Sequence, residues 1–265
     1  MTAPLFLLDT EHDDAPINRS EVREGWVLTL PAGVRRHAID AMRLADGAKL
    51  QLSDGQGLRI DALIEDSRLA QARVLGFTIE PQPVTRLCLI QALAKTGHDE
   101  QAIDMATQIG VDAIIPWQAD RSIAKWKNGR TDAKWSKVLR SATEQSRRAW
   151  IPSLAGCISS KEIVAVCRRA CVRGDMVIVL HQDATTNWDG VEAGVEELER
   201  RCMADGKPRT ISVVIGPEGG IGAEEVEAFS DAGARICALG TNIMRASTAG
   251  PVALSLLSRI LGRFR

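Results

Sequence analysis

The chain has 265 residues, 45% of them hydrophobic and 25% charged, and its formal net charge is −1 at pH 7. This composition is ordinary for a globular protein, and no run of roughly 18 apolar residues is present, which excludes a transmembrane helix of ordinary length. The first residues lack the basic region and the apolar length of a signal peptide, so the sequence predicts a cytoplasmic protein.

The charges are distributed unevenly along the sequence. Residues 1–82 hold nine Lys or Arg and thirteen Asp or Glu, whereas residues 121–148 hold nine basic and two acidic residues. Trp126, Trp135 and Trp150 lie within or beside the basic segment. A basic segment with tryptophans indicates a polyanionic partner such as RNA, although a solvated helix face explains the same charges equally well.

Residues 1–80 contain short segments in which apolar and polar residues alternate, the pattern of half-buried strands. Ser53-Asp-Gly-Gln-Gly57 separates two of these segments and indicates a hairpin turn. One stretch, residues 35–44, has a helical pattern. Together they predict a small β-rich unit, and the prolines of Glu80-Pro-Gln-Pro-Val84 predict a linker after it. The predicted strands are 26–30, 49–52 and 58–63.

From residue 86 onward, predicted strands alternate with predicted helices, which is the pattern of an α/β protein with a mostly parallel sheet. The predicted strands are 86–93, 111–116, 175–181, 211–215 and 236–239. The predicted helices are 99–109, 131–148, 160–172, 189–203, 224–232 and an apolar last helix over 252–261, with Ser247 and Thr248 as candidate capping residues and Pro251 in its first turn.

The cysteines predict no metal site. Cys167 and Cys171 are four residues apart, which places them on one helix face, but no second Cys or His pair stands nearby. Buried reduced thiols are the better interpretation of all six cysteines. They are Cys88, Cys157, Cys167, Cys171, Cys202 and Cys237.

Two loops near the C-terminus carry the strongest functional signal. Gly216-Pro-Glu-Gly-Gly220 follows the apolar run 211–215, and Leu239–Ala249 follows the apolar run 236–239. Loops that follow parallel strands meet at one edge of an open α/β sheet, where such proteins bind ligands. The sequence therefore predicts that these two loops form one ligand site.

The first loop does not have the pattern of a phosphate cradle. Neither G-x-x-x-x-G-K-S/T nor G-x-G-x-x-G is present in the required context, and Glu218, Glu224 and Glu225 place negative charge at the loop and the following helix. The predicted ligand is therefore neutral or partly cationic, and a plain turn without a ligand is the alternative. In the second loop, Arg245 suits an oxyanion or a phosphate, or else a surface ion pair.

Three segments together resemble the ribosomal RNA small subunit methyltransferase E family: the 216–220 loop, the Leu239–Ala249 loop, and Glu144-Gln-Ser with Arg148 and Ile151-Pro152. That family belongs to the SPOUT class of S-adenosylmethionine-dependent RNA methyltransferases. The resemblance covers nearly the whole chain and implies a PUA-like RNA-binding β-barrel over 1–80 and a SPOUT methyltransferase domain over 85–265. It also implies a deep trefoil knot, an exception to the rule that chains avoid knots, and a homodimer with its sites at or near the subunit interface.

The resemblance further implies a reaction and its site residues. From the residues themselves, neither a metal ion nor a membrane is expected. The reaction is methylation of N3 of a uridine in 16S rRNA, in the decoding region of the small ribosomal subunit. Arg245, Arg121 and Arg148 are then candidates for stabilising the uridine anion, and His181 is a weaker candidate base. The implied cofactor-binding residues are Leu180, His181, Gly216, Pro217, Glu218, Gly219, Gly220, Leu239, Gly240, Ile243, Met244, Thr248 and Ala249. The implied RNA-binding residues are Lys125, Lys127, Arg130 and Arg147, and Trp126 is a candidate for stacking on a base.

The chain departs from the family pattern at four places. Ser247 stands where Glu is usual, and Gln182 stands where the third-strand loop commonly has an acid. The usual Lys-Gly-Asp/Glu loop reads Lys95-Thr-Gly-His98, and the usual Glu-Leu-Gly-Val reads Gln108-Ile-Gly-Val111. No cofactor glycine is lost, so methyl transfer remains the prediction, but the carry-over of a carboxylate base is weakened. The alternatives are methylation of another RNA, a non-catalytic RNA-binding protein and a nucleotide-dependent α/β enzyme.

Overall fold

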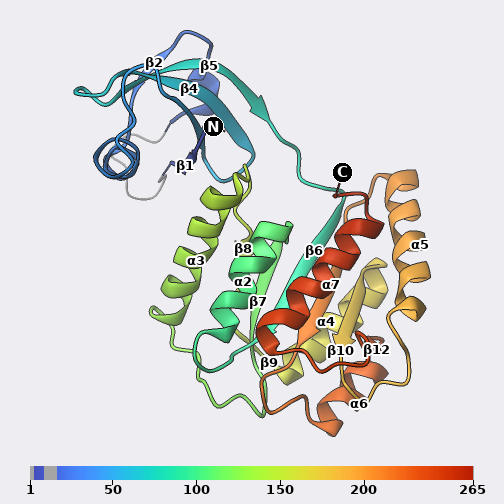
Figure 1. Cartoon of the computed structure of the whole chain (residues 1–265). Helices are drawn as coiled ribbons and strands as arrows, with labels where there is room; N and C mark the ends of the chain where they lie inside the picture. The colour runs from blue at the N-terminus through green and yellow to red at the C-terminus, as the bar shows by residue number, and fades with distance from the viewer. Residues whose placement is uncertain (1–2, 9–16, 265) are drawn as a thin grey trace. The chain divides into compact units, whose positions relative to one another are not determined.

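The computed structural model describes residues 3–8 and 17–264, and its contacts divide the chain into two units (Figure 1). The first unit comprises Met1–Gln82 together with Arg140–Ile151, and the second comprises Pro83–Leu139 together with Pro152–Arg265. The acidic residues at 9–14 that contribute to the predicted negative N-terminal region lie outside the described residues. None of the helices in the described part of the chain is long and apolar enough to cross a membrane.

The first unit contains a five-stranded sheet with the strand order β1-β3-β4-β5-β2. The strands β3 and β4 pair antiparallel from Ser53 and Arg59 outward, which confirms the predicted hairpin. The strand β5 pairs antiparallel with β4 on the side opposite β3, and its inward-facing residues, such as Ala72 and Val74, belong to the buried core. The bounds are β1 (Leu5–Leu7), β2 (Val27–Thr29), β3 (Lys49–Ser53), β4 (Leu58–Asp66) and β5 (Gln71–Ile79), with short helical turns η1 (Arg19–Glu21), α1 (Ala32–Arg35) and η2 (Arg36–Ala41).

The helix predicted over 35–44 begins earlier and changes type along its length. It starts after Pro31, whose fixed φ suits the residue before a first helical turn, and from Arg36 it continues as a π-helix. Val34 of the α-helical turn and Ala38 of the π-helix belong to the core, and Ile39 packs against it. Periodicity at 3.6 residues per turn could not predict this shift.

Residues 140–151 pack with the first unit through backbone contacts near the β3–β4 turn. The Ser53 hydroxyl and the Gly57 amide both donate to the Ala149 carbonyl, at 3.0 and 2.9 Å, and the Trp150 indole donates to the Glu80 carbonyl at 2.8 Å. Gly57 has φ +103°, and a Cβ there would lie 2.7 Å from the Trp150 ring. Only glycine permits both this backbone conformation and this close approach.

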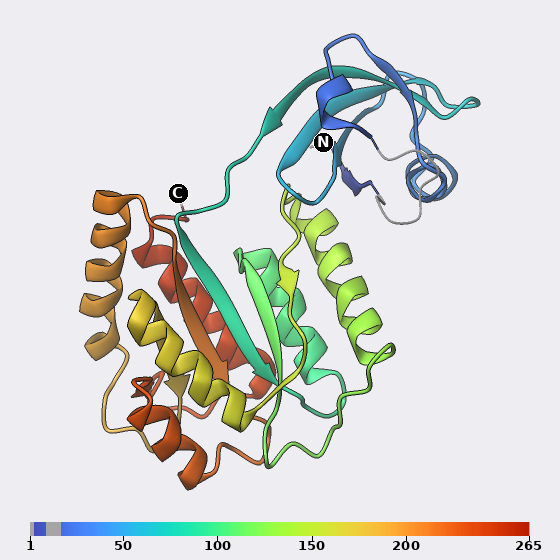
Figure 2. The same cartoon turned by 180° about the vertical axis from the view of Figure 1, so that it is seen from behind.

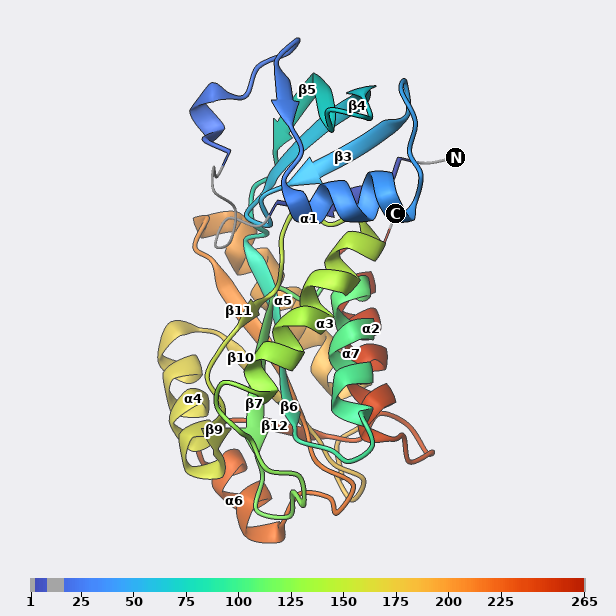
Figure 3. The ribbon, with the colours of Figure 1, turned by 90° about the vertical axis from the view of Figure 1, so that its left-hand side faces the viewer.

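The second unit is built on a parallel sheet with the order β12-β10-β11-β6-β7-β8, and β9 also pairs with β7. Helices α2 and α7 cover one face and α4 and α6 the other (Figures 2 and 3), and α5 packs beside α7. The strands are β6 (Thr85–Ala92), β7 (Ala113–Gln118), β8 (Ser153–Leu154), β9 (Ile158–Ser159), β10 (Met176–Leu180), β11 (Arg209–Ile215) and β12 (Arg235–Cys237). The helices are α2 (His98–Ile109), α3 (Thr131–Ser146), α4 (Ser160–Arg173), α5 (Asp189–Asp205), α6 (Ala223–Asp231) and α7 (Ala246–Ile260). The predicted α/β class with a mostly parallel sheet is confirmed.

The last helix corrects one sequence expectation. α7 begins at Ala246 with Arg245 as its N-cap and no side-chain cap, so neither Ser247 nor Thr248 caps it. Pro251 therefore lies in the second turn, where its missing N–H costs one helical hydrogen bond. Pro251 and the neighbouring Gly250 are buried, and Gly250 approaches Leu89 and Ile215 so closely that a Cβ would meet them at 2.9 and 3.4 Å. This packing against the sheet explains why the helix extends to Ala246 despite the proline.

Candidate active site

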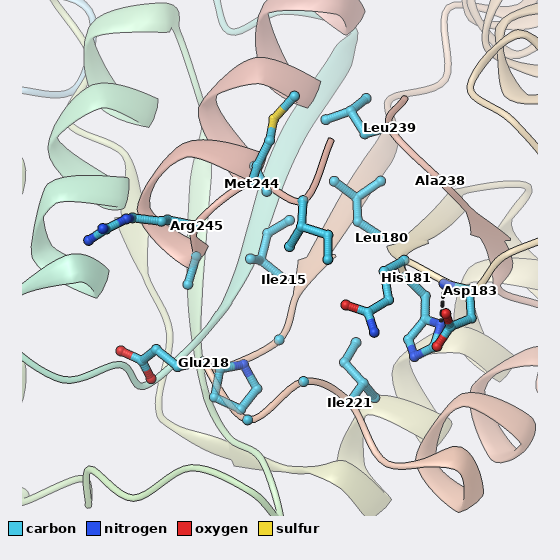
Figure 4. A pocket seen from close by; sticks show the side chains of 18 of the residues that line it. Leu180, His181, Asp183, Ile215, Glu218, Ile221, Ala238, Leu239, Met244 and Arg245 are labelled. Carbon is cyan, nitrogen blue, oxygen red and sulfur yellow. Dashed lines mark hydrogen bonds between the residues drawn. The ribbon is translucent and has the colours of Figure 1, made fainter. Parts of the chain in front are cut away.

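A pocket of about 630 Å³ lies in the second unit at the carboxyl edge of the sheet, where the loops after β10, β11 and β12 converge (Figure 4). This size is within the usual range for small-molecule sites. Central strand β11 lies between β10 and β6, so its loop emerges in the middle of this edge. The lining residues are 180–183, 215–221, 238–246, His98, Arg121 and Ala249.

Apolar side chains form the middle of the pocket. Leu180 ends β10, Ile215 ends β11, and Leu239 and Met244 come from the loop after β12 (Figure 4). Ile215 is 3% exposed and belongs to the core, whereas Leu180, Leu239 and Met244 are half-buried and face the pocket. Such a surface favours a flat, partly apolar group such as a purine ring.

Two glycines of the 216–220 loop are required by geometry. A Cβ at Gly216 would lie 2.6 Å from Cγ1 of Ile221, so a side chain there would displace a pocket residue. Gly220 has φ +72°, and its amide donates to the Pro217 carbonyl at 2.9 Å to close a tight turn. The sequence prediction of a glycine-dependent turn at this strand end is confirmed.

The Glu225 carboxylate binds the segment that follows this loop to two other parts of the chain. It is 6% exposed; Oε2 accepts from the Gly222 amide at 2.8 Å, and Oε1 accepts from the Ser160 hydroxyl at 2.5 Å and the Asp120 amide at 3.2 Å. The carboxylate therefore joins the start of α6 to the start of α4 and to the loop after β7. Sequence reasoning treated Glu225 only as a helix-dipole charge, although a Glu at the third position of a helix is the signal of a capping box.

These hydrogen bonds explain why the loop is not a phosphate cradle. A phosphate at a helix N-terminus binds free backbone N–H groups. Here the Gly222 amide is used by Glu225 and the Gly220 amide by Pro217. Two of the amides just before α6 are thus already bonded to the chain's own groups.

Two neighbouring loops contact the other side of the 216–220 loop. Glu218 Oε1 accepts from the backbone amide of Lys95 at 2.8 Å, and Arg121 Nη1 donates to the Gly219 carbonyl at 3.2 Å. Lys95 follows β6 and Arg121 follows β7. The loops after five parallel strands therefore meet around this pocket.

His181 lies on the side of the pocket formed by the β10 loop. Its Nδ1 accepts from the Asp183 amide at 3.3 Å, so a neutral ring carries its proton on Nε2 (Figure 4). Its backbone amide donates to the Cys237 carbonyl at 3.0 Å. Burial raises the pKa of the Cys237 thiol to about 11, so that thiol stays protonated near neutral pH and is not a nucleophile.

The structure brings most of the predicted cofactor residues together. Of the thirteen, all except Thr248 line the pocket; Thr248 is exposed on the first turn of α7. The sequence missed other lining residues, of which His98 and Asp183 carry ionisable groups. Asp183 follows the predicted Leu180-His181 pair directly, so its place could have been inferred, whereas His98 could not be placed without the fold.

The predicted arginines and basic RNA-binding residues are divided between the two units. Arg245 and Arg121 line the pocket. Arg147 and Arg148 belong to the first unit, where the Arg147 carbonyl accepts from Nη2 of Arg59 at 2.9 Å. Lys125, Lys127 and Arg130 are exposed in the segment between β7 and α3 of the second unit.

Trp126 is part of the packing of the basic segment. Its ring meets the buried Trp135 edge to face, with centroids 5.5 Å apart and an angle of 84°. Its indole N–H donates to Oδ1 of Asn128 at 2.9 Å. These contacts support the structural interpretation of this residue over a free stacking platform.

The donor set of the pocket fits S-adenosylmethionine better than a nucleoside phosphate. Its middle is apolar, Glu218 and Asp183 place carboxylates on two sides, and the helix N-terminus is already occupied by Glu225. A sulfonium cation is compatible with the nearby carboxylates of Glu218 and Asp183. Among residues 3–8 and 17–264, no group of His, Cys, Asp and Glu is arranged to hold a metal ion.

Comparisons with known proteins show the family that the chain matches. Residues 80–258 match the RNA methyltransferase domain family. The chain is 34% identical over 269 residues to ribosomal RNA small subunit methyltransferase E of Mycobacterium bovis, covering all of this chain and 94% of that protein. A crystal structure of ribosomal RNA small subunit methyltransferase E from Neisseria gonorrhoeae bound to S-adenosylmethionine is similar with a TM-score of 0.78, 22% identity and 98% coverage of both chains. A putative methyltransferase from Legionella pneumophila in complex with the same cofactor has a TM-score of 0.76, 23% identity and 98% coverage of both chains.

Proposed function

Because the chain belongs to the ribosomal RNA small subunit methyltransferase E family, we propose that it transfers a methyl group from S-adenosylmethionine to N3 of a uridine in the decoding region of 16S rRNA. The observation that carries this proposal is the pocket at the sheet edge, where the Gly220 amide of the glycine turn donates to Pro217 and the Gly222 amide after it donates to Glu225. The cofactor bound in the Neisseria and Legionella proteins, which share this fold, supports the choice of cofactor. The ribosomal target places the enzyme in the cytoplasm.

The chain's own residues would hold the cofactor, which when bound supplies an electrophilic methyl group on a positively charged sulfur. Leu180, Leu239 and Met244 would provide the apolar surface for its adenine ring, and the 216–220 turn would close the pocket beside it. Together these loops exclude water and fix the orientation of the reactants. Positioning of this kind can supply roughly 7–11 kcal/mol of a barrier.

A uridine must lose its N3 proton, so the enzyme has to stabilise negative charge on the base. Arg245 and Arg121 reach the pocket from two different loops and are suited to contact the uracil oxygens. Arg148 remains a candidate from the first unit. The carry-over of a carboxylate base from the family is weakened, because Ser247 and Gln182 stand where the family usually has acidic residues.

Two further features of the family are part of the proposal. The edge strand β12 is followed by α7, which packs on β11 and β6, so the chain must cross back past β10 between them. In this crossing segment, the Ala238 amide donates to the Thr186 carbonyl at 2.9 Å. These facts support a trefoil knot in which residues 238–245 pass through the loop after β10. The dimer would place the exposed Ile243, which is 80% exposed and lines the pocket, at or near the subunit interface.

RNA binding would combine both parts of the chain. We assign a PUA-like barrel over 1–80 and a methyltransferase domain over 85–265, with phosphate contacts from Lys125, Lys127, Arg130 and Arg147. Phosphate contacts release counterions, so affinity for the small subunit should fall steeply as salt rises, and the triple variant K125Q/K127Q/R130Q should have a shallower salt dependence. Equal slopes for the wild type and the triple variant, measured by filter binding, would contradict these contacts.

The function is tested with two measurements on the purified full chain. Calorimetry with S-adenosylmethionine, S-adenosylhomocysteine, ATP and NAD should detect binding of the first two only; binding of ATP or NAD alone would favour a nucleotide-dependent enzyme. Mass mapping of 16S rRNA from a deletion strain, before and after addition of the protein and cofactor, should show one new N3-methyluridine. A new methyl group in another RNA would support the alternative target, and binding of RNA without methylation would support a non-catalytic protein.

A further inference from the structure

The imidazole of His98 is a pocket group to which neither cofactor binding nor charge stabilisation assigns a role. His98 is the first residue of α2, is half-buried and lines the pocket. Within the described part of the chain, its ring makes no hydrogen bond and no ion pair. Both ring nitrogens are therefore available to a bound molecule.

The loop that presents His98 is fixed at several points. Oδ2 of Asp99 accepts from the Ala94 amide at 3.4 Å, the Lys95 amide donates to Glu218, and the His98 amide donates to the Lys95 carbonyl at 3.1 Å. Thr96 has φ +53°, a left-handed conformation that is unusual for a β-branched residue. Strained backbone of this kind is concentrated at functional sites, where the surrounding structure maintains it.

The other imidazole in the pocket is poorly placed to remove a proton. Nδ1 of His181 accepts from the Asp183 amide, so its neutral ring has no free lone pair. Figure 4 shows His181 and Asp183 on one side of the pocket and Glu218 and Arg245 on the other. The His98 loop is bonded to Glu218, which places it on the side of the arginine proposed to hold the base.

We propose that a ring nitrogen of His98 accepts the N3 proton of the target uridine. The inference rests on the proposed function. As the N3–CH₃ bond forms, the S–CH₃ bond breaks and its electron pair stays on sulfur, which becomes neutral. The N3 proton passes to His98, and the imidazolium later releases it to water.

The surrounding charges suit this exchange. Arg121 and Arg245 line the pocket as cations and favour an anionic base, while Glu218, Asp183 and His181 are the other ionisable residues in the lining besides His98. On α2 itself, Asp99 accepts backbone amides and Glu100 pairs with Lys134 at 2.5 Å. The carboxylates next to His98 along the chain are therefore already engaged.

The test compares His98→Gln and His98→Ala with the wild type in single-turnover methylation of small subunits across roughly pH 5 to 9, where histidine changes charge. Both variants should lose about 100-fold or more in rate, the acid limb of the wild-type profile should disappear in His98→Gln, and added imidazole should partly restore His98→Ala. Cofactor affinity from calorimetry should be unchanged, which excludes misfolding. Gln101→Ala, at an exposed position one turn along α2, is the matched control and should behave as the wild type.

A second readout does not depend on turnover. In NMR spectra of protein labelled at its histidine nitrogens, the His98 ring should respond to a uridine-containing oligonucleotide in the presence of S-adenosylhomocysteine, and should not respond to the same strand with N3-methyluridine. An unchanged acid limb in His98→Gln, or a loss confined to KM for the subunit, would overturn the proton-acceptor role. If the wild type itself forms no N3-methyluridine, the proposed function fails and this inference fails with it.

Discussion

Arg245 and Arg121 enter the pocket from loops that are far apart in sequence, and they differ in what holds them. Arg121 donates to the Gly219 carbonyl at 3.2 Å, so its guanidinium also supports the glycine turn. Arg245 is the N-cap residue of α7 and is exposed at the pocket edge. Substitution of Arg121 would therefore disturb cofactor binding and chemistry together, whereas Arg245 offers the cleaner measurement.

Arg245→Ala should lower kcat by roughly 100- to 1000-fold, the loss typical of removing one charge-stabilising donor, and should leave S-adenosylmethionine affinity nearly unchanged. Arg245→Lys is the matched variant and should retain part of the rate because it keeps the positive charge. Single-turnover methylation and calorimetry separate the two effects. A wild-type rate in Arg245→Ala would exclude this residue from catalysis.

Glu225→Gln should destabilise the second unit by about 2–3 kcal/mol, because a buried carboxylate that accepts three hydrogen bonds is replaced by a group that must donate with its nitrogen. The same change should weaken cofactor binding, since Gly222 loses its partner. Glu224→Gln, at the exposed neighbouring position, should change neither quantity. Denaturant unfolding and calorimetry provide the comparison, and equal stability of the two variants would contradict the role of Glu225.

At the scale of elements, the regular alternation of strands and helices was predictable, because the apolar residues of each element recur in the pattern of a strand or of a helix. The strand β10 is a continuous apolar run, β6 and β11 each contain a run of apolar residues, and glycine ends both α2 and α4 in the left-handed conformation. The π-helix and the early start of α7 were not predictable, because tertiary packing decides them. The pocket was predictable where it follows strand ends, but His98 enters it only because β6 lies beside β11.

The start of α4 gives a pH-dependent prediction. The carboxylate of Glu162 accepts from the Ser159 amide and hydroxyl, both at 2.7 Å, and these bonds lower the pKa of the carboxyl in the folded state. A carboxyl with a lowered folded pKa contributes stability above its unfolded pKa, and this contribution is lost as pH falls through the folded value.

Glu162→Gln should therefore lower the free energy of unfolding at pH 7, and the difference from the wild type should shrink as the solution is acidified below about pH 4. Urea unfolding at several pH values measures it. Lys161→Gln, at the exposed preceding residue, is the control and should not show the same acid-dependent convergence. A difference that stays constant with pH would mean that the capping charge is not responsible.

At the scale of the whole molecule, neither unit is formed by one continuous segment of the sequence. Residues 140–151 return to the first unit after more than fifty residues of the second, and α3 contributes to both. A boundary near residue 82 follows from composition, because two prolines interrupt the pattern there. The placement of residues 140–151 in the first unit does not follow from composition, because it depends on single contacts. Examples are the hydrogen bonds of the Trp150 indole to the Glu80 carbonyl and of Arg59 to the Arg147 carbonyl.

The second unit also connects its last residues to its first strand. Beyond α7, Arg263 donates to the Gly110 carbonyl at 2.8 Å and to the Thr85 carbonyl at 2.5 Å, and it pairs with Asp112 at 2.9 Å. Arg263 and Asp112 are 18% and 14% exposed at their side chains, so the pair is largely shielded from water. These contacts lie at the amino ends of β6 and β7, opposite the pocket, which is at the carboxyl ends.

Arg263→Gln should therefore reduce the free energy of unfolding by about 2–3 kcal/mol, because it removes the ion pair between Arg263 and the shielded Asp112 carboxylate and the hydrogen bonds that Arg263 donates to two carbonyls. The variant should also unfold faster, since the end of α7 is no longer held to β6, while cofactor affinity stays at the wild-type value. Arg259→Gln, one turn earlier and exposed, is the matched control and should leave stability unchanged. Equal unfolding rates for the two variants, or a loss of cofactor affinity in Arg263→Gln alone, would contradict a purely stabilising contact at this end of the sheet.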